Sequence, residues 1–565
     1  MLGYGLSGIV QNVLVKPAVM IWPETLVSCS IFRTLHDEEE SNPIVNGKYR
    51  ITKIRFFVLV SCCAFIYQFL PGYLFTVLSS VSILCFVFPK NIVAQQLGSG
   101  MTGLGMGSIS LDWSLIASYL GSPLSTPFWA ATNIFAGFLL FGWIVVPIGY
   151  YNNWFEAKKF PIISSGLFDI FGRKYDIARV TTNNGTVLDE AGYNNYSPIR
   201  ISFFFAMNYG LALAIMVAAI VHVLLNNFSE FSRLFKSNDS LKNEDIHSKL
   251  MRKYKSVPNW WYAVLFTSTL SVALIVCENK DINLPWWGLI LAISIAAILV
   301  FPYGIVSAIT NVTLGINVIS EFVAGLIFPG MPIANLAFKT YGCTTLRQAL
   351  WLTSDLKLGH YMKVPPRDMF IAQASGTFIS GLINLITTHY LIRTVPNICH
   401  KDAYPWTCPS TNVFYSASII WGLIGPVKMF GPSSIYNCLL YGFLLGAVLP
   451  FIPWLLARKF KKSLFLRHIH VPIFLMACSV LPPAAAAEFP TWFIVAFIFN
   501  FVIYQRHHWW WLRYNYILSA ALMTGTALCG VFIFYAFQLH DLKVNWWGNA
   551  KDFHCPLASK PLITP

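Results

Sequence analysis

The amino-acid sequence predicts an all-α, polytopic integral membrane protein, with about 11–13 transmembrane helices and several re-entrant or broken segments. Of its 565 residues, 56% are hydrophobic and only 11% are charged, whereas soluble domains carry about 25% charged residues. The apolar residues are gathered in runs close to the length of about 20 residues that a helix needs to cross a bilayer. No shift in composition marks a soluble domain, so we expect residues 1–565 to form a single unit in the lipid bilayer.

The net charge of +15 does not indicate a nucleic-acid partner. The basic residues lie in short loops between apolar runs, and the positive-inside rule places such loops on the cytoplasmic side of a membrane. The 12 cysteines are scattered and form neither a CxxC pair nor a Cys/His spacing typical of a metal site. Paired catalytic groups are not evident either. We therefore expect no metal, no cofactor and no enzymatic activity.

In the first half of the chain, residues 1–30 are apolar only over a short run and have the character of the tail of an incomplete N-terminal helix region. Residues 97–126 are so rich in Gly and Ser that we expect a re-entrant or unwound segment, with Asp112 as a candidate pathway residue. The loop 226–258 carries seven Lys or Arg against four Asp or Glu, which predicts a cytoplasmic loop. Spans are predicted at 56–88, broken by Pro71-Gly72 into a hairpin or kinked helix, and at 128–151, 201–225, 260–277 and 286–308.

In the second half, the loop 393–411 holds Cys399 and Cys408. A disulfide is plausible if this loop faces the outside, and two free thiols are an equally open alternative. Glu488 lies in an apolar stretch near a predicted turn, where it could be exposed to the outer aqueous phase. Further spans are predicted at 368–391, 437–456, 471–488, 490–505 and 516–538, together with a Gly/Pro-broken segment at 414–431.

The segment 313–367 contains the main candidate site. It opens as an apolar helix that Pro329 and Gly330 interrupt, and Glu321 lies in its middle. A charge at the centre of a membrane helix costs about 2.5–3.5 kcal/mol, and broken helices persist at membrane depth only where they line a cavity or are buried in protein. Asn317 lies four residues before Glu321 and so shares its helix face.

Two interpretations of Glu321 remain open. Desolvation disfavours the charged form of a buried carboxylate, so Glu321 could take up a proton or bind an amine of a substrate. Alternatively, it pairs with a neighbouring helix for structure alone. The hypothetical substrate or proton pathway therefore comprises Glu321, Asn317, Pro329 and Gly330, with Asp112 as a further candidate.

The end of this segment is polar and basic. We interpret it as a cytoplasmic collar, because positive charge at the end of a membrane helix follows the positive-inside rule. No catalytic arrangement is visible in its spacing. The double proline that precedes Arg367 predicts a sharp helix start, since proline suits the first turn of a helix. The collar residues are Asp355, His360, Lys363 and Arg367.

Several stretches resemble the oligopeptide transporter family of fungi and plants. The resemblance follows the chain in order from residue 1 almost to the end. It rests on FPGMPIANLAFKTYG (328–342), DLKLGHYMKVPPRDMF (355–370), AQQLGSGMTGLGMGSISLDWSLIASYLGSPLSTPFWA (94–130), KKFPIISSGLFD (158–169), PNICHKDAYPWTCPS (396–410), VFYSASIIWGLIGP (413–426) and RYNYILSAAL (513–522).

This resemblance implies a multi-pass transporter, which we expect in the plasma membrane. The implied activity is proton-coupled import of tetra- and pentapeptides, and possible further substrates are glutathione and peptide-like metal chelates. The proton gradient would supply the energy, without a cofactor. The family's NPG signature is not found, so we expect the chain to lack the amino-terminal part of the family pattern. The alternative from another class is a non-transporting membrane scaffold or truncated isoform.

Overall fold

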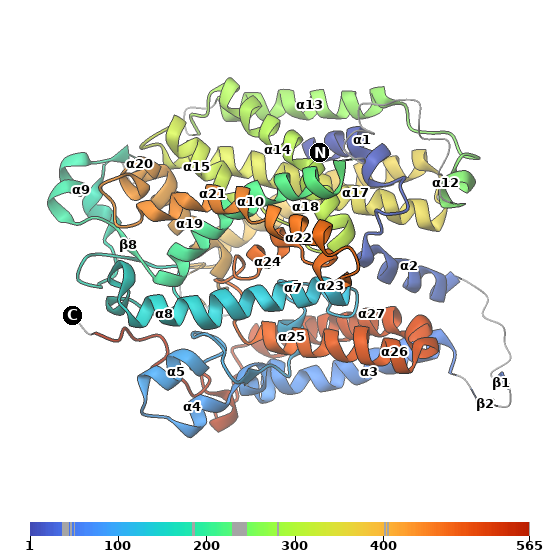
Figure 1. Ribbon diagram of the computed structural model, residues 1–565, viewed down its shortest axis with the longest axis horizontal. Coiled ribbons are helices and arrows are strands. Elements are labelled where there is room, and N and C mark those ends of the chain that lie inside the picture. The colour runs from blue at the N-terminus through green and yellow to red at the C-terminus, as the bar shows by residue number, and fades with distance from the viewer. Residues whose placement is uncertain are drawn as a thin grey trace. The chain divides into compact units, whose positions relative to one another are not determined.

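The computed structural model describes residues 1–36, 44–45, 48–49, 51–182, 187–228, 246–278, 282–399, 403 and 406–563 (Figure 1). Its contacts divide the chain into two compact units. Unit 1 comprises Met1–Trp22, Ser165–Ile201 and Ala206–Met476, and unit 2 comprises Pro23–Ser164, Ser202–Phe205 and Ala477–Pro565.

Unit 1 is built from helices, with only two-residue strands. The strands are β5 (Leu167–Phe168), β6 (Thr181–Thr182), β7 (Val187–Leu188) and β8 (Arg200–Ile201), paired β5–β8 and β6–β7, both antiparallel. The helices are α1 (Leu2–Leu14), α9 (Glu190–Tyr196), α10 (Phe203–Asn226, whose first three residues belong to unit 2), α12 (Ile246–Met251), α13 (Asn259–Cys277), α14 (Trp286–Thr310), α15 (Asn317–Ile327), α16 (Pro332–Lys339), α17 (Thr345–Met362), α18 (Pro366–Thr394), α19 (Pro409–Ser418), α20 (Pro426–Phe430), α21 (Gly442–Val448), α22 (Phe451–Lys459), α23 (Leu464–Arg467) and α24 (Val471–Met476).

The core of unit 1 forms where helices with small residues approach closely. Gly3 of α1 lies so near α17 that a Cβ there would come within 2.7 Å of Ala349 N and Thr345 O. Small residues at helix interfaces are the usual means of close packing in membrane proteins. α14 packs beside α1, α16 and α17, and its Leu289 and Ala292 are completely buried. These contacts hold the broken helix of unit 1 in place.

Unit 2 is likewise helical. Its strands are β1 (Ile44–Val45), β2 (Lys48–Tyr49), β3 (Val81–Ser82) and β4 (Ser108–Ile109), paired β1–β2 and β3–β4, both antiparallel. Its helices are α2 (Pro23–His36), α3 (Lys53–Phe69), α4 (Ile83–Val87), α5 (Ile92–Gly98), α6 (Trp113–Ile116), α7 (Phe128–Phe138), α8 (Val146–Tyr151), α25 (Glu488–Phe497), α26 (Tyr504–Arg506) and α27 (His508–Ile533).

Two helix pairs organise unit 2. α3 and α27 run side by side (Figure 1), and Gly525 allows this approach because a Cβ there would lie 2.5 Å from Ser61 O. α7 and α25 are joined by stacked aromatic rings. The rings of Phe138 and Phe489 lie 4.3 Å apart with an interplanar angle of 3°. Helices from the early and the late part of the sequence therefore share one core.

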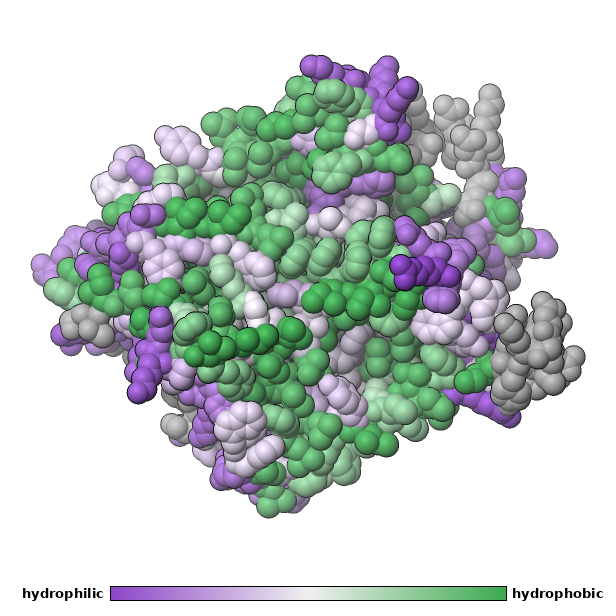
Figure 2. Space-filling view, turned by 60° about the horizontal axis from the view of Figure 1, so that its bottom comes forward, coloured by the Kyte–Doolittle hydropathy of each residue, from purple (hydrophilic) through white to green (hydrophobic). Residues whose placement is uncertain are grey.

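The structure confirms the all-α membrane class. Within the described residues, nine helical runs are long and apolar enough to cross a membrane by length and composition: Lys53–Leu74, Phe128–Tyr151, Phe203–Asn226, Asn259–Cys277, Trp286–Thr310, Pro366–Thr394, Asn437–Lys459, Glu488–Arg506 and His508–Gln538. Figure 2 shows many hydrophobic residues exposed on the visible surface. An apolar surface of this extent indicates contact with lipid.

Two of the segments discussed above do not form continuous transmembrane helices. Residues 97–126 form no continuous helix, as their Gly and Ser content predicts, and contain only the end of α5, β4 and α6. The predicted span at 471–488 is wrong, because α24 ends at Met476 and the chain then turns. Pro482 and Pro483 contribute to the difference, since neither has an N–H to donate and a single helix therefore cannot continue through them.

Candidate functional site

The broken helix reverses direction at Pro329-Gly330. The chain leaves α15 at Phe328, passes Gly330 with a φ of +77°, and enters α16 at Pro332. Glycine adopts a positive φ without the steric cost that a Cβ brings, and proline suits the first turn of a helix. α16 therefore packs back along α15.

The reversal brings Glu321 and Lys339 together inside unit 1. Lys339 Nζ donates a hydrogen bond to Glu321 Oε1 at 2.5 Å. The side chains are only 4% exposed for Lys339 and 2% exposed for Glu321. Moving such charges out of water costs several kcal/mol per ion, which their attraction offsets only in good geometry. A change in the charge of either group therefore alters the energy of the whole site.

Neighbouring side chains define the surroundings of this pair. Lys339 Nζ lies 3.5 Å from the centre of the Phe414 ring, a cation–π contact. Asn335 Nδ2 donates to the backbone carbonyl of Glu321 at 3.0 Å. Asn335 Oδ1 is buried and has no hydrogen-bond partner among the described residues. Asn317 accepts a hydrogen bond from the thiol of Cys343. The site thus combines a cation, a carboxylate and an available amide oxygen.

The second broken segment of the sequence packs directly against the first. Residues Ile419–Ile424 form a π-helical turn that ends at Gly425, which has a φ of +86°. A Cβ on Gly325 of α15 would lie 2.2 Å from Trp421 O of that turn. π-Helical turns interrupt regular helices and occur frequently at functional sites. Both Pro/Gly-interrupted segments of unit 1 therefore meet beside Glu321.

Asp112 lies in unit 2 and organises the unwound segment. It is the N-cap of α6, where Oδ1 accepts from the Ser114 backbone N–H at 2.9 Å and the Ser114 hydroxyl at 2.6 Å. Gln68 Nε2 donates to the same oxygen at 2.8 Å, and Ser79 Oγ donates to Oδ2 at 2.8 Å. Asp112 is therefore surrounded by neutral donors, whereas Glu321 faces a cation.

Glu488 is buried, which corrects the interpretation that it could face the aqueous phase. Its exposed fraction is 0%. Oε1 accepts from the backbone N–H groups of Tyr119 and Leu120 at 3.1 and 3.0 Å, and Oε2 accepts from Ser118 Oγ at 3.1 Å. The unwound stretch after α6 leaves these donors without helical partners, and Glu488 satisfies them. The sequence around Glu488 gave no sign of this burial, because it shows only that the residue lies near a turn.

Substitutions at Glu488 can test this structural role. We expect the free energy of unfolding of the Glu488→Gln variant to lie within about 1 kcal/mol of that of the native protein, because the amide oxygen of Gln can still accept both N–H groups. In the Glu488→Leu variant, the free energy of unfolding should fall by about 1–3 kcal/mol for each buried donor that is left unsatisfied. Thermal unfolding of the purified protein in detergent measures both. A Leu variant as stable as the Gln variant would contradict the assignment.

The collar residues connect several segments of unit 1. Lys363 caps the carboxyl end of α17 and donates to His360 O at 2.8 Å. Arg367 Nε donates to Ser256 O at 3.1 Å. Asp355 lies exposed on α17, whereas the nearby Lys357 is fully buried and donates to Val15 O and Pro17 O at 2.7 and 3.2 Å. The collar therefore joins the ends of α1 and α17 to the segment before α13.

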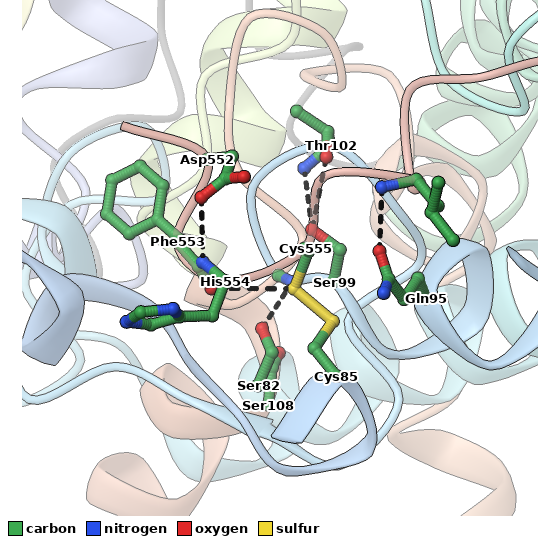
Figure 3. The surroundings of a disulfide bond; sticks show 12 residues. Ser82, Cys85, Gln95, Ser99, Thr102, Ser108, Asp552, Phe553, His554 and Cys555 are labelled. Atoms are coloured by element: carbon green, nitrogen blue, oxygen red, sulfur yellow. Dashed lines mark hydrogen bonds between the residues drawn. A yellow bond between two sulfur atoms is a disulfide. The ribbon is translucent and has the colours of Figure 1, made fainter. Parts of the chain in front are cut away.

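Two disulfides are present among the described residues. One joins Cys399 to Cys408 in the loop after α18. The other joins Cys85 of α4 to Cys555, and Figure 3 shows it beside the Gly-rich segment and the carboxyl-terminal stretch of the chain. The sequence carries no signal for the second bond, because Cys85 lies in an apolar run and the cysteines are 470 residues apart. In the described part of the chain, no group of three or more His, Cys, Asp or Glu residues could hold a metal.

A membrane protein with interrupted helices that enclose a buried ion pair has the features of a transporter, since such folds build their sites at discontinuous helices. The family model described as OPT oligopeptide transporter protein matches residues 1–537. The chain belongs to this OPT family, a family of transporters rather than of enzymes.

Three relatives from Arabidopsis thaliana are similar over nearly the whole chain. Oligopeptide transporter 5 is 44% identical, over 99% of this chain and 75% of its own length. Oligopeptide transporter 1 is 44% identical, over 100% of this chain and 75% of its own length. Oligopeptide transporter 7 is 43% identical, over 99% of this chain and 73% of its own length. The chain thus spans about three quarters of the length of these relatives.

Proposed function

We propose that this protein is a secondary active transporter that imports small oligopeptides, such as tetra- and pentapeptides, together with protons. The observation that carries the proposal is the buried Glu321–Lys339 pair at the broken helix, in a member of a family whose relatives are named oligopeptide transporters. A peptide carries a carboxylate at one end, and this group is complementary to the Lys339 ammonium when Glu321 does not neutralise it.

The proposed coupling follows from charge balance. Removing one partner of a buried ion pair costs about 3–5 kcal/mol, because the other charge is left uncompensated. A proton on Glu321 neutralises the carboxylate and leaves the Lys339 ammonium without its counter-ion. The carboxylate of a bound peptide can then take the place of Glu321 beside Lys339. Proton binding and peptide binding thereby favour one another.

We further propose a location in the plasma membrane, with the collar in the cytoplasm. α18 carries Arg367 in its first turn, whereas the Cys399–Cys408 disulfide follows its other end. Basic residues favour the cytoplasmic side, and disulfides persist in oxidising compartments outside it. The proton gradient across this membrane supplies the energy without a cofactor.

Uptake into proteoliposomes tests this function. With an inwardly directed proton gradient, we expect a radiolabelled tetrapeptide to accumulate above its external concentration, and a protonophore should abolish this accumulation. Equal uptake with and without the gradient would contradict proton coupling. No uptake at all would favour the scaffold alternative. Selective accumulation of a peptide–metal chelate over the free peptide would identify the chelate as the substrate.

A further inference from the structure

Unit 2 contains a cavity of about 250 Å³ beside its unwound segment. Residues of α3, α25 and α27 and the stretch on both sides of Asp112 form its wall. The cavity lies at membrane depth, because two of its lining residues, Ala64 and Leu522, are near the middle of the spans Lys53–Leu74 and His508–Gln538. Its volume is below the range of about 300–1,000 Å³ that is typical of sites for whole small molecules. The cavity therefore suits a single side chain of a larger ligand.

Hydroxyl groups in the wall take part in hydrogen bonds within unit 2. Tyr67 OH donates to Leu111 O at 2.9 Å. Thr491 Oγ1 accepts from the Ser110 backbone N–H at 2.9 Å, and Ser110 Oγ accepts from the Asp112 backbone N–H at 3.2 Å. Because these groups already have partners, the wall offers mainly carbon to a ligand. Burying a polar group there without a hydrogen bond would be costly, so the cavity favours an apolar group.

The irregular backbone of the wall indicates that this part of the cavity does not face lipid. Ser110 and Leu111 line the cavity and belong to no helix, and Leu111 is 46% exposed. Hydrocarbon cannot form hydrogen bonds with irregular backbone, so such backbone occurs at membrane depth only where protein buries it or where it lines a water-filled cavity. Interrupted segments of this kind form the substrate sites of transporters. The exposed part of the segment is therefore suited to a solute pathway.

Trp113 adds one hydrogen-bond donor to the wall. Its Nε1 is buried and has no hydrogen-bond partner in the part of the chain that the structure describes. An unpaired buried donor is costly, and an acceptor brought by a ligand relieves that cost. The backbone carbonyls of a peptide are such acceptors, whereas the acyl chain of a lipid has none. The wall thus favours a peptide over a lipid tail.

We propose that this cavity receives a large apolar side chain, such as that of leucine, from the transported oligopeptide. The inference rests on the proposed function and adds a substrate preference to it. It also assigns a role to the Gly- and Ser-rich segment, since that segment supplies Ser110, Leu111 and Trp113 to the wall. A tetrapeptide with leucine at the matching position then binds more tightly than one with only small side chains, because burial removes apolar surface from water.

Competition binding to the purified full-length protein in detergent tests the cavity. Labelled tetra-alanine is the probe, and its four single-leucine variants are the competitors. We expect the best of them to compete at least about tenfold better than unlabelled tetra-alanine, since one methylene in an apolar pocket discriminates by about 10–200-fold. Val495 lines the cavity, so Val495→Phe should fill it and reduce the leucine preference to within about twofold, with the affinity for tetra-alanine unchanged.

Two further variants complete the test. Val495→Thr keeps the side-chain volume but adds a hydroxyl to the wall, so it should also weaken the leucine preference. Val531→Phe is the matched control and should keep that preference, because Val531 is 56% exposed on α27 and does not line the cavity. All three variants should unfold at the native temperature.

The outcomes separate this inference from the proposed function. Equal competition by all five peptides, in a native protein that accumulates tetra-alanine, would overturn the inference and leave the proposed function intact. A loss of leucine preference in Val531→Phe as large as that in Val495→Phe would do the same. If equal competition is accompanied by a copurifying phospholipid that Val495→Phe loses, the cavity holds an acyl chain instead. A native protein that neither binds nor accumulates any of the peptides would contradict both proposals.

Discussion

The Glu321→Gln variant is expected to lose proton-driven accumulation of a tetrapeptide and to unfold more easily than the native protein. The substitution leaves the Lys339 ammonium buried without its carboxylate, which costs about 3–5 kcal/mol. Uptake in proteoliposomes and thermal unfolding in detergent measure the two effects separately.

A double variant separates function from stability. Glu321→Leu combined with Lys339→Met removes both charges, and replacing a buried ion pair by well-packed hydrophobic residues of similar volume is often neutral or stabilising. We therefore expect native-like unfolding together with a continued loss of proton-driven uptake. Accumulation by the double variant at the native rate would show that the pair is only structural.

The ion pair between Lys428 and Glu190 provides the matched control. Its atoms are 2.8 Å apart, but the Glu190 side chain is 74% exposed. Water screens such surface pairs, which contribute little to stability. Glu190→Gln should therefore leave both unfolding and uptake close to those of the native protein. A loss comparable to that of Glu321→Gln would mean that burial does not explain the effect.

Gly325→Ala is expected to destabilise the contact between the two broken segments. The new Cβ would lie 2.2 Å from Trp421 O and 2.7 Å from Pro426 Cδ. Relieving this overlap requires backbone movement, and overpacking of this kind costs about 1–3 kcal/mol. Thermal unfolding should show the loss. Uptake should fall as well, because the displaced helix carries Glu321.

The control for this substitution is Gly381→Ala in α18, where nothing lies within 4 Å of the added Cβ. Alanine is preferred over glycine in a helix by about 1 kcal/mol, so the control should be neutral or slightly stabilising. Equal unfolding temperatures for the two variants would contradict the proposed packing of α15 against the π-helical turn.

Much of the local structure could be predicted from the sequence. Apolar length alone located the spans from Phe128 to Thr310, because a helix that crosses a bilayer needs about 20 residues. Proline and glycine likewise located the interruptions near Gly330 and Gly425, since each changes the backbone at its own position. The functional importance of Glu321 could also be suspected from the sequence, because a charge inside an apolar membrane helix is costly whatever its partners are.

The partners of these residues could not be predicted. Lys339 follows Glu321 by 18 residues, and only the reversal at Gly330 turns it towards the carboxylate. Glu488 binds donors about 370 residues earlier in the chain. Neither distance along the sequence carries a periodic signal. The predicted span at 471–488 failed for a related reason, since its apolar residues are buried in turns rather than in one helix.

The sequence by itself determined that this protein lies in a membrane, where its helices are interrupted, and to which family it belongs. These properties depend on hydrophobic length, backbone chemistry and the order of motifs along the chain, and none of them requires knowing which distant segments pack together. Only the tertiary structure decided that Glu321 meets Lys339, that Glu488 is buried, and that Cys85 is bonded to Cys555. Those contacts depend on which distant segments pack together, because hydrogen bonds and ion pairs act over a few ångströms in space and are independent of separation along the chain.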